Sequence, residues 1–359
     1  MTFRDALAGK IPISLVTGFL GSGKTTLIAR LLRHPGMNRA AVIINEVGEI
    51  GIDHDLVANV TENMSLLANG CICCSVRTDL QDSLRELFNQ RRAGQIPEFD
   101  RVIIETTGLA DPAPVVQTLL SDTLINHHFR LDGLVTLVDA FHGLDLMQRQ
   151  PEAIKQIAMA DRIFITKIDL ASDEVLQTLR DALTALNPRA DQIDVLNGNI
   201  EPALLTGLGL HSAVGSSDAL RFLGEDIQSP SSKTSAEGRY LGATPSRNDA
   251  AIRTLSLRFV APFVWSGFSA ALELLTTLRG PDMLRVKGIV NVEGKPVVVQ
   301  GVQHIFSPPI ELDKWPSADH DSRLVFITRN IESDTIRNLM GAVTSLGSFE
   351  SLPTNPSSI

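Results

Sequence analysis

The chain has 359 residues, of which 43% are hydrophobic and 20% charged, so it is long enough for two domains with buried cores. This composition argues against global disorder. A formal net charge of −9 argues against nucleic acid or an anionic membrane surface as the main partner. No apolar run reaches the roughly 18 residues of a membrane span, and the N-terminal sequence does not resemble a signal peptide. We therefore expect a cytoplasmic protein.

Short apolar runs alternate with helical patterns through the first half of the chain. Most of these runs are continuous, as expected for strands that are covered on both faces. We expect strands at ISLVTG (13–18), AAVIIN (40–45), RVIIE (101–105), GLVTLVDA (133–140), RIFITK (162–167) and QIDVL (192–196). A helix is expected over 174–187, where leucines recur on one face. This order predicts an α/β domain with a mostly parallel sheet over residues 1–209.

The composition changes over residues 210–250, which are rich in Ser, Gly and Pro and predict a linker or a mobile excursion. RTLSLRFV, directly after it, alternates polar and apolar residues as a half-buried antiparallel strand does. The following patterns predict a helix near 268–278, a hairpin turning at Glu293-Gly294-Lys295, a strand at RLVFITRN and a last helix near 332–346. We expect a smaller α+β domain over 251–350 and a tail over 351–359.

The motif GFLGSGKT (18–25) lies between the first expected strand and a helix, and it matches the phosphate-binding P-loop pattern. Glycines let backbone N–H groups surround phosphate oxygens, a lysine reaches the β- and γ-phosphates, and a hydroxyl ligates Mg²⁺. Lys24 is therefore a candidate catalytic residue as well as a phosphate ligand, and Thr25 a candidate Mg²⁺ ligand. The expected nucleotide contacts are Gly18, Gly21, Ser22, Gly23, Lys24, Thr25 and Thr26.

A second part of a nucleotide site is expected at RVIIETTG (101–108). Its strand ends in Glu105, a carboxylate placed to act near Mg²⁺. Gly108 follows three residues later, where its N–H could sense a γ-phosphate. We take Glu105 and Gly108 as candidate catalytic residues.

The sequence TKID, at the end of a later strand, indicates which base is bound. GTPases usually carry Asn-Lys-x-Asp at this position. An aspartate accepts hydrogen bonds from guanine N1 and N2, whereas adenine lacks that pair of donors, so Lys167 and Asp169 favour GTP. Thr166 replaces the usual asparagine, and we expect this change to remove a side chain that braces the loop.

All three cysteines of the chain lie within four positions, as Cys71, Cys73 and Cys74 in NGCICCSV. Cys71 and Cys73 share a side of an extended segment, and Cys74 joins them if the chain turns. The next residues have a helical pattern, and a nearby helix N-terminus favours the thiolate. Thiolates prefer Zn²⁺ and related ions, so we expect a transferable metal site. Thiol redox chemistry and a buried reduced cluster are the alternatives.

Five motifs together resemble the CobW family of P-loop GTPases. They are the P-loop, NEVGEIGID (45–53), GCICC (70–74), ETTGLADP (105–112) and TKID (166–169). The segment from Leu284 to Phe306 resembles the C-terminal domain of that family. The resemblance covers nearly the whole chain outside residues 210–250.

The resemblance implies a metal-responsive GTPase that delivers Zn²⁺, Co²⁺ or Ni²⁺ to a client metalloprotein. It makes residues 45–53 a switch loop that GTP and Mg²⁺ order through Glu46 or Glu49, and it makes Glu49 a further candidate metal ligand. The smaller domain would then recognise the client or form a homo-oligomer. Leu109 stands where many GTPases have glutamine and cannot orient water, so we expect slow intrinsic hydrolysis.

Two other functions fit parts of the sequence. A phosphotransferase that uses ATP or GTP would need a base for its acceptor hydroxyl, and nucleotide competition would distinguish it from a GTPase. A redox switch without a metal would form a disulfide, whereas bound Zn²⁺ would protect the thiols from alkylation.

Overall fold

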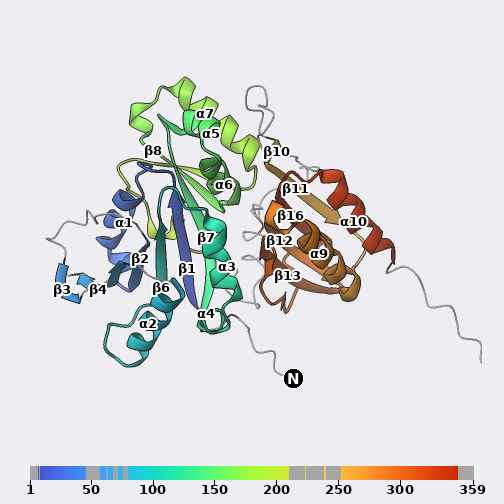
Figure 1. The fold of residues 1–359 in the computed structure, drawn as a ribbon, viewed down its shortest axis with the longest axis horizontal. Coiled ribbons are helices and arrows are strands. Elements are labelled where there is room, and N and C mark those ends of the chain that lie inside the picture. The colour runs from blue at the N-terminus through green and yellow to red at the C-terminus, as the bar shows by residue number, and fades with distance from the viewer. Residues whose placement is uncertain are drawn as a thin grey trace, which may run out of the picture.

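The computed structural model describes residues 7, 9–45, 57–61, 64–67, 72–75, 80–209, 223, 238–239 and 252–346. They form two sheets with their helices, one in each half of the chain (Figure 1). The predicted fold class, a mostly parallel α/β domain followed by a smaller α+β domain, is confirmed. Of residues 210–250, Leu223 and the short strand Gly238–Arg239 are described, and the expected tail lies outside the described residues.

The first sheet has nine strands in the order β3-β4-β5-β2-β6-β1-β7-β8-β9. From β5 to β9 all neighbours are parallel, while β3, β4 and β5 pair antiparallel at one edge. The six expected strands are confirmed, and β3, β4 and β5 are additions to them. The strands are β1 (Ile11–Gly18), β2 (Ala40–Asn45), β3 (Val57–Thr61), β4 (Met64–Leu67), β5 (Ile72–Ser75), β6 (Arg101–Thr106), β7 (Phe129–Asp139), β8 (Arg162–Thr166) and β9 (Asp191–Val195).

Alternate residues of the central strands enter two apolar cores, one on each face of this sheet. In β2, for example, Ala41 and Ile43 belong to one core, and Val42 and Ile44 belong to the other. Helix α1 covers one face, and most of the other helices cover the opposite face (Figure 1). The helices are α1 (Lys24–Leu32), α2 (Leu80–Arg92), α3 (Pro112–Ser121), α4 (Thr123–His128), α5 (Gly143–Arg149), α6 (Pro151–Met159) and α7 (Asp173–Leu186).

The second sheet is antiparallel, with the order β10-β11-β16-β12-β13-β14 and β15 beside β13. The expected hairpin is confirmed, because Val292 pairs with Lys295 and the two turn residues have positive φ of 52° and 92°. The elements are β10 (Gly238–Arg239), β11 (Ile252–Phe259), α9 (Trp265–Arg279), β12 (Met283–Val292), β13 (Lys295–Val302), β14 (Ile305–Phe306), β15 (Ile310–Glu311), β16 (Ser322–Arg329) and α10 (Ser333–Leu346).

The second sheet lies between two layers of helices. Helices α9 and α10 pack on one face over a core of their own. The other face contacts α3, α6 and α7, and residues such as Leu284 and Ile327 join the core of the first domain. Among the described residues, no helix combines the length and apolar character that a membrane crossing requires.

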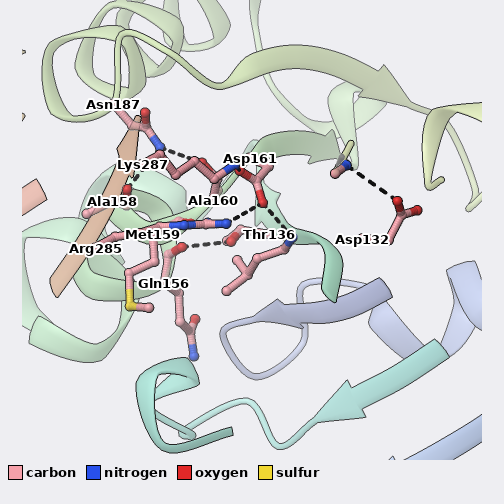
Figure 2. Close-up of polar contacts among 12 residues, drawn as sticks. Asp132, Thr136, Gln156, Ala158, Met159, Ala160, Asp161, Asn187, Arg285 and Lys287 are labelled. Carbon is pink, nitrogen blue, oxygen red and sulfur yellow. Dashed lines mark hydrogen bonds and ion pairs between the residues drawn. The ribbon is translucent and has the colours of Figure 1, made fainter. Parts of the chain in front are cut away.

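A buried ion cluster joins the two domains. Asp161, between α6 and β8, accepts from Arg285 Nη2 at 2.8 Å and from Lys287 Nζ, both on β12 (Figure 2). Burial alone would raise the pKa of Asp161, but the two cations outweigh it and hold the pKa below its usual range. Burial lowers the pKa of Lys287 to about 8, although Asp161 opposes that change.

The Lys287 pKa predicts how stability changes with pH. Between about pH 8 and pH 10.5 the unfolded chain keeps the Lys287 proton while the folded protein loses it. The free energy of unfolding of the wild type, minus that of Lys287→Met, should therefore rise across this range, by at most about 3 kcal/mol. Urea unfolding of both proteins at several pH values measures this difference. A difference that stays constant from pH 7 to pH 10 would contradict the assignment.

Candidate nucleotide and metal site

The P-loop connects β1 to α1 through a tight turn that requires glycine. Gly18 has φ of 143°, and a Cβ there would lie 2.5 Å from the carbonyl oxygen of Leu137. Gly23 has φ of 93° and is the N-cap residue of α1. The turn therefore places the N-terminus of α1, with the N–H groups of its first turn, at the carboxyl end of the sheet, as phosphate binding requires.

Lys24 is buried at the start of α1, with 5% of its surface exposed. Its ammonium donates to the carbonyl oxygens of Gly18 at 2.8 Å and Phe19 at 3.2 Å. These bonds hold the ammonium within the curve of the P-loop. A phosphate oxygen placed there would be a stronger, charge-assisted partner than either carbonyl.

Thr25 and Glu105 meet where β1 and β6 end. The Thr25 hydroxyl donates to Glu105 Oε1 at 3.0 Å, and the Glu105 side chain is fully buried. Magnesium prefers hard oxygen ligands, usually one or two carboxylate or hydroxyl oxygens together with phosphate and water. This donor pair beside the P-loop therefore fits Mg²⁺. Thr26 is exposed in the first turn of α1, and its expected phosphate contact stays a prediction.

Gly108 packs against the P-loop, three residues after Glu105. A Cβ at this position would lie 2.6 Å from the backbone nitrogen of Leu20, so any larger residue would push the two loops apart. The loop after β6 and the P-loop are thus in direct contact. Leu109 follows with 55% of its surface exposed.

The base-recognition motif is braced, contrary to our expectation from the sequence. We expected threonine at position 166 to remove the brace that asparagine usually provides. Thr166 Oγ1 instead lies 2.8 Å from the carbonyl oxygen of Ser22 in the P-loop and 3.3 Å from that of Val138. The short side chain suffices because the end of β8 lies next to the P-loop.

Lys167 and Asp169 differ in their surroundings. Lys167 has a left-handed backbone, with φ of 55°, and its ammonium lies 2.7 Å from Asp139 Oδ2. Asp139, at the end of β7, is 4% exposed and also accepts from the N–H groups of Phe141 and His142. Asp169 lies in the single 3-10 turn Ile168–Leu170 and is exposed. Asp139 thus fixes the lysine, while the aspartate is accessible to a base.

Two parts of this site were missed by the sequence reasoning. Asp139 ends a parallel strand, which is a usable signal for a functional carboxylate. The turn after β9 gave no comparable signal. There a Cβ on Gly198 would lie 3.0 Å from the carbonyl oxygen of Thr26, so this turn packs against the first turn of α1.

Cys73 and Cys74 lie in β5, which pairs with β2 on one side and with β4 on the other. The strand continues through Cys74 to Ser75, so the backbone does not turn at Cys74. Helix α2 begins at Leu80, as the pattern after the cysteines indicates. Cys71, Glu46 and Glu49 lie outside the described residues, and the metal ligands stay a prediction.

The cysteine strand is linked to the nucleotide site through one intervening strand. In β2, Ile43 pairs with both Cys74 and Ile104, and Ile44 pairs with both Ser75 and Glu105. Glu105 also pairs with Val16, two residues before Gly18. Residues paired across neighbouring strands therefore form a continuous connection from the cysteine strand, through β2 and β6, to β1, the strand that leads into the P-loop.

Two family models match the chain. The model described as the CobW/HypB/UreG nucleotide-binding domain matches residues 12–194, and that of the cobalamin synthesis protein CobW C-terminal domain matches residues 252–344. The chain belongs to the CobW family. Its first domain is thus a P-loop nucleotide-binding domain of a GTPase family, and the resemblance inferred from the motifs is confirmed.

Individual relatives agree with the CobW assignment. Zinc chaperone YjiA of Escherichia coli (strain K12) is 33% identical over 329 residues, which cover 91% of this chain and 96% of that protein. The zinc-regulated GTPase metalloprotein activator 1 of Saccharomyces cerevisiae is 26% identical, over 92% of this chain and 83% of that protein. The crystal structure of zinc-bound YjiA GTPase has a TM-score of 0.69 and 30% identity, over 93% of this chain and 99% of that one.

Proposed function

We propose that this CobW-family protein is a GTP-driven metal chaperone, with Zn²⁺ as its cargo and a client metalloprotein as the recipient. Relatives that match nearly the whole chain are named zinc chaperone and zinc-regulated GTPase metalloprotein activator. The oxygens of Thr25 and Glu105 beside the P-loop support binding of a nucleotide with Mg²⁺. The three cysteines within four positions support binding of the cargo by thiolates. Co²⁺ and Ni²⁺ also suit thiolates, and we propose Zn²⁺ from the relatives' names.

One observation carries the proposal more than any other, namely the two partners of strand β2. The strand pairs with the cysteine strand on one side and with the Glu105 strand on the other, and its end leads to residues 46–53. A change at Glu105 therefore has a short route to the cysteine strand. Because coupling is reciprocal, bound metal must then alter nucleotide affinity by the same factor.

The positions of four residues support the proposed roles in hydrolysis. Lys24 would bind the β- and γ-phosphates, and the Gly108 N–H would contact the γ-phosphate. Thr25 and Glu105 would hold Mg²⁺, which neutralises charge that develops on the phosphates. Leu109 supplies no group to orient the attacking water. We therefore propose a slow intrinsic rate, which a partner or metal raises.

Residues 45–53 complete the proposed cycle. GTP would order this loop through Glu46 or Glu49, and hydrolysis would release it. Glu49 is the proposed additional ligand of the cargo beside Cys71, Cys73 and Cys74. The C-terminal domain is the proposed surface for the client, and self-association through it is a further proposal.

The base preference has a direct test in Asp169→Ala. Loss of the charge-assisted hydrogen bonds to guanine should lower the preference for GTP over ATP by about 10- to 100-fold. Competition of each nucleotide against a fluorescent GTP analogue measures the preference, and Asp173→Ala, at the start of α7, is the control. An unchanged preference would favour the phosphotransferase alternative.

Thiol accessibility tests the cargo assignment against the redox alternative. Wild-type protein is treated with an alkylating reagent with and without Zn²⁺, and with and without a prior reductant. A metal site predicts that Zn²⁺ protects the thiols and that the reductant has no effect. Thiols that become reactive only after reduction would establish a disulfide and overturn the cargo assignment.

A further inference from the structure

Gln156 is a buried side chain of α6 that contacts the loop after β6. It is 1% exposed, and its amide nitrogen donates to the carbonyl oxygens of Gly108 at 3.1 Å and Ala110 at 3.0 Å. Both amide protons are thus used on one loop. The reverse amide orientation would place an oxygen against two carbonyl oxygens, so the hydrogen-bond network fixes the orientation.

These two bonds determine how the loop faces the P-loop. Because a peptide unit is planar, a carbonyl of Gly108 held by Gln156 turns the N–H of Leu109 to the opposite side. Gly108 is also pressed against Leu20. The conformation of the loop at the proposed γ-phosphate position therefore depends on an α6 side chain that is not part of any nucleotide motif.

The carboxyl end of the same helix is held by the C-terminal domain. Arg285 Nη1 donates to the carbonyl oxygen of Met159, and Arg285 Nη2 pairs with Asp161 at 2.8 Å (Figure 2). Arg285 belongs to β12, and its side chain is 7% exposed. The Asn187 side-chain amide nitrogen donates to the carbonyl oxygens of Ile157 and Ala160, both at 2.9 Å. Asn187 thus holds the end of the helix from within the first domain.

Gln156 and Met159 are three residues apart, less than one turn of helix. A short helical segment among packed side chains moves as a unit and does not absorb a displacement at one end. The Thr136 hydroxyl, which donates to the carbonyl oxygen of Gln156 at 2.7 Å, attaches this segment to β7. Because the segment is short and packed, a shift of the loop at Gly108 that moves Gln156 would also move Met159, and with it Arg285.

We propose that Gln156 is a positioning residue for the loop at Gly108–Ala110, and that α6 transmits the state of this loop to β12 of the C-terminal domain. The inference rests on the proposed GTPase cycle and adds to it a route by which the nucleotide changes the domain interface. Gln156 acts on the nucleotide through the loop and makes no contact with it.

The test uses Gln156→Met, which keeps the volume of the side chain and removes the donor. The preference for a GTP analogue over GDP should fall about 10-fold, with GDP affinity unchanged within about 2-fold. Amide hydrogen exchange of α6 and β12 should differ between the two nucleotide states in the wild type, and this difference should disappear in the variant. Gln177→Met, an exposed glutamine of α7 that bonds Asp181, is the matched control.

The outcomes separate this inference from the proposed function. If the variant keeps both the nucleotide preference and the exchange difference, the inference is overturned while the GTPase cycle stands. If the wild type itself binds no guanine nucleotide, the proposed function fails first. Should Gln156→Met not fold, Gln156→Asn keeps a buried amide but is one methylene shorter, and the same losses are expected from it.

Discussion

Replacing Asp161 with alanine is expected to lower the free energy of unfolding by about 3–5 kcal/mol. Asp161 is the carboxylate that both Arg285 and Lys287 contact, and these side chains are only 7% and 11% exposed. Without it, two largely buried cations of the C-terminal domain would lose the carboxylate that both of them contact. The N–H of Leu134, which donates to Asp161 Oδ2 at 2.8 Å, would also lose that acceptor.

Chemical denaturation of the full-length protein measures this effect. Asp145→Ala is the matched control, because Asp145 forms an ion pair with Arg149 in which both side chains are more than half exposed. Such a pair contributes at most about 1 kcal/mol. If the two variants were equally stable, the buried cluster would not hold the domains together.

Replacing Lys24 with methionine is expected to lower the rate of GTP hydrolysis by about 10²- to 10³-fold. Methionine retains an apolar chain of similar length but has no ammonium to stabilise charge on the phosphates. The ammonium is also the proposed partner of the phosphate oxygens, so GTP affinity should fall as well. Phosphate release under single-turnover conditions separates the chemical step from binding.

The control for this variant is Lys295→Met, which changes a lysine on β13 that pairs with Glu311 at the surface. Its hydrolysis rate should match that of the wild type. Thermal unfolding of both variants shows whether the P-loop change acts through the chemistry or through stability. If Lys24→Met hydrolysed GTP at the wild-type rate, Lys24 would not be a catalytic residue.

The sequence could predict the central strands because each is a short apolar run between turn residues. β1, β2, β6, β7 and β8 are buried on both faces, which leaves a continuous pattern in the chain. The hairpin of β3 and β4 has no such pattern, since it lies at the edge of the sheet. The order of the strands in space also depends on long-range pairing, which a local pattern does not record.

The candidate site was predictable wherever a motif has fixed spacing, as at Lys24, Thr25 and Glu105. Asp139 within the site, and Gln156 and Asp161 outside it, were missed because their partners lie 28 to 126 residues away in the sequence. The opposite error occurred at Thr166. There the motif suggested that a bracing side chain is lost. The end of β8 lies so close to the P-loop that the Thr166 hydroxyl bonds the carbonyl oxygen of Ser22 instead, and the sequence alone does not give that distance.

The most direct test of the proposed function is the Zn²⁺ affinity of the protein in its two nucleotide states. Competition with a chromogenic chelator would be measured with a GTP analogue and with GDP, for the wild type and for Cys73→Ala/Cys74→Ala. We predict an affinity that differs about 10-fold between the states and a difference that disappears in the variant. Equal affinity in both states, or affinity that survives loss of the thiols, would contradict coupling between GTP and a thiolate-bound cargo.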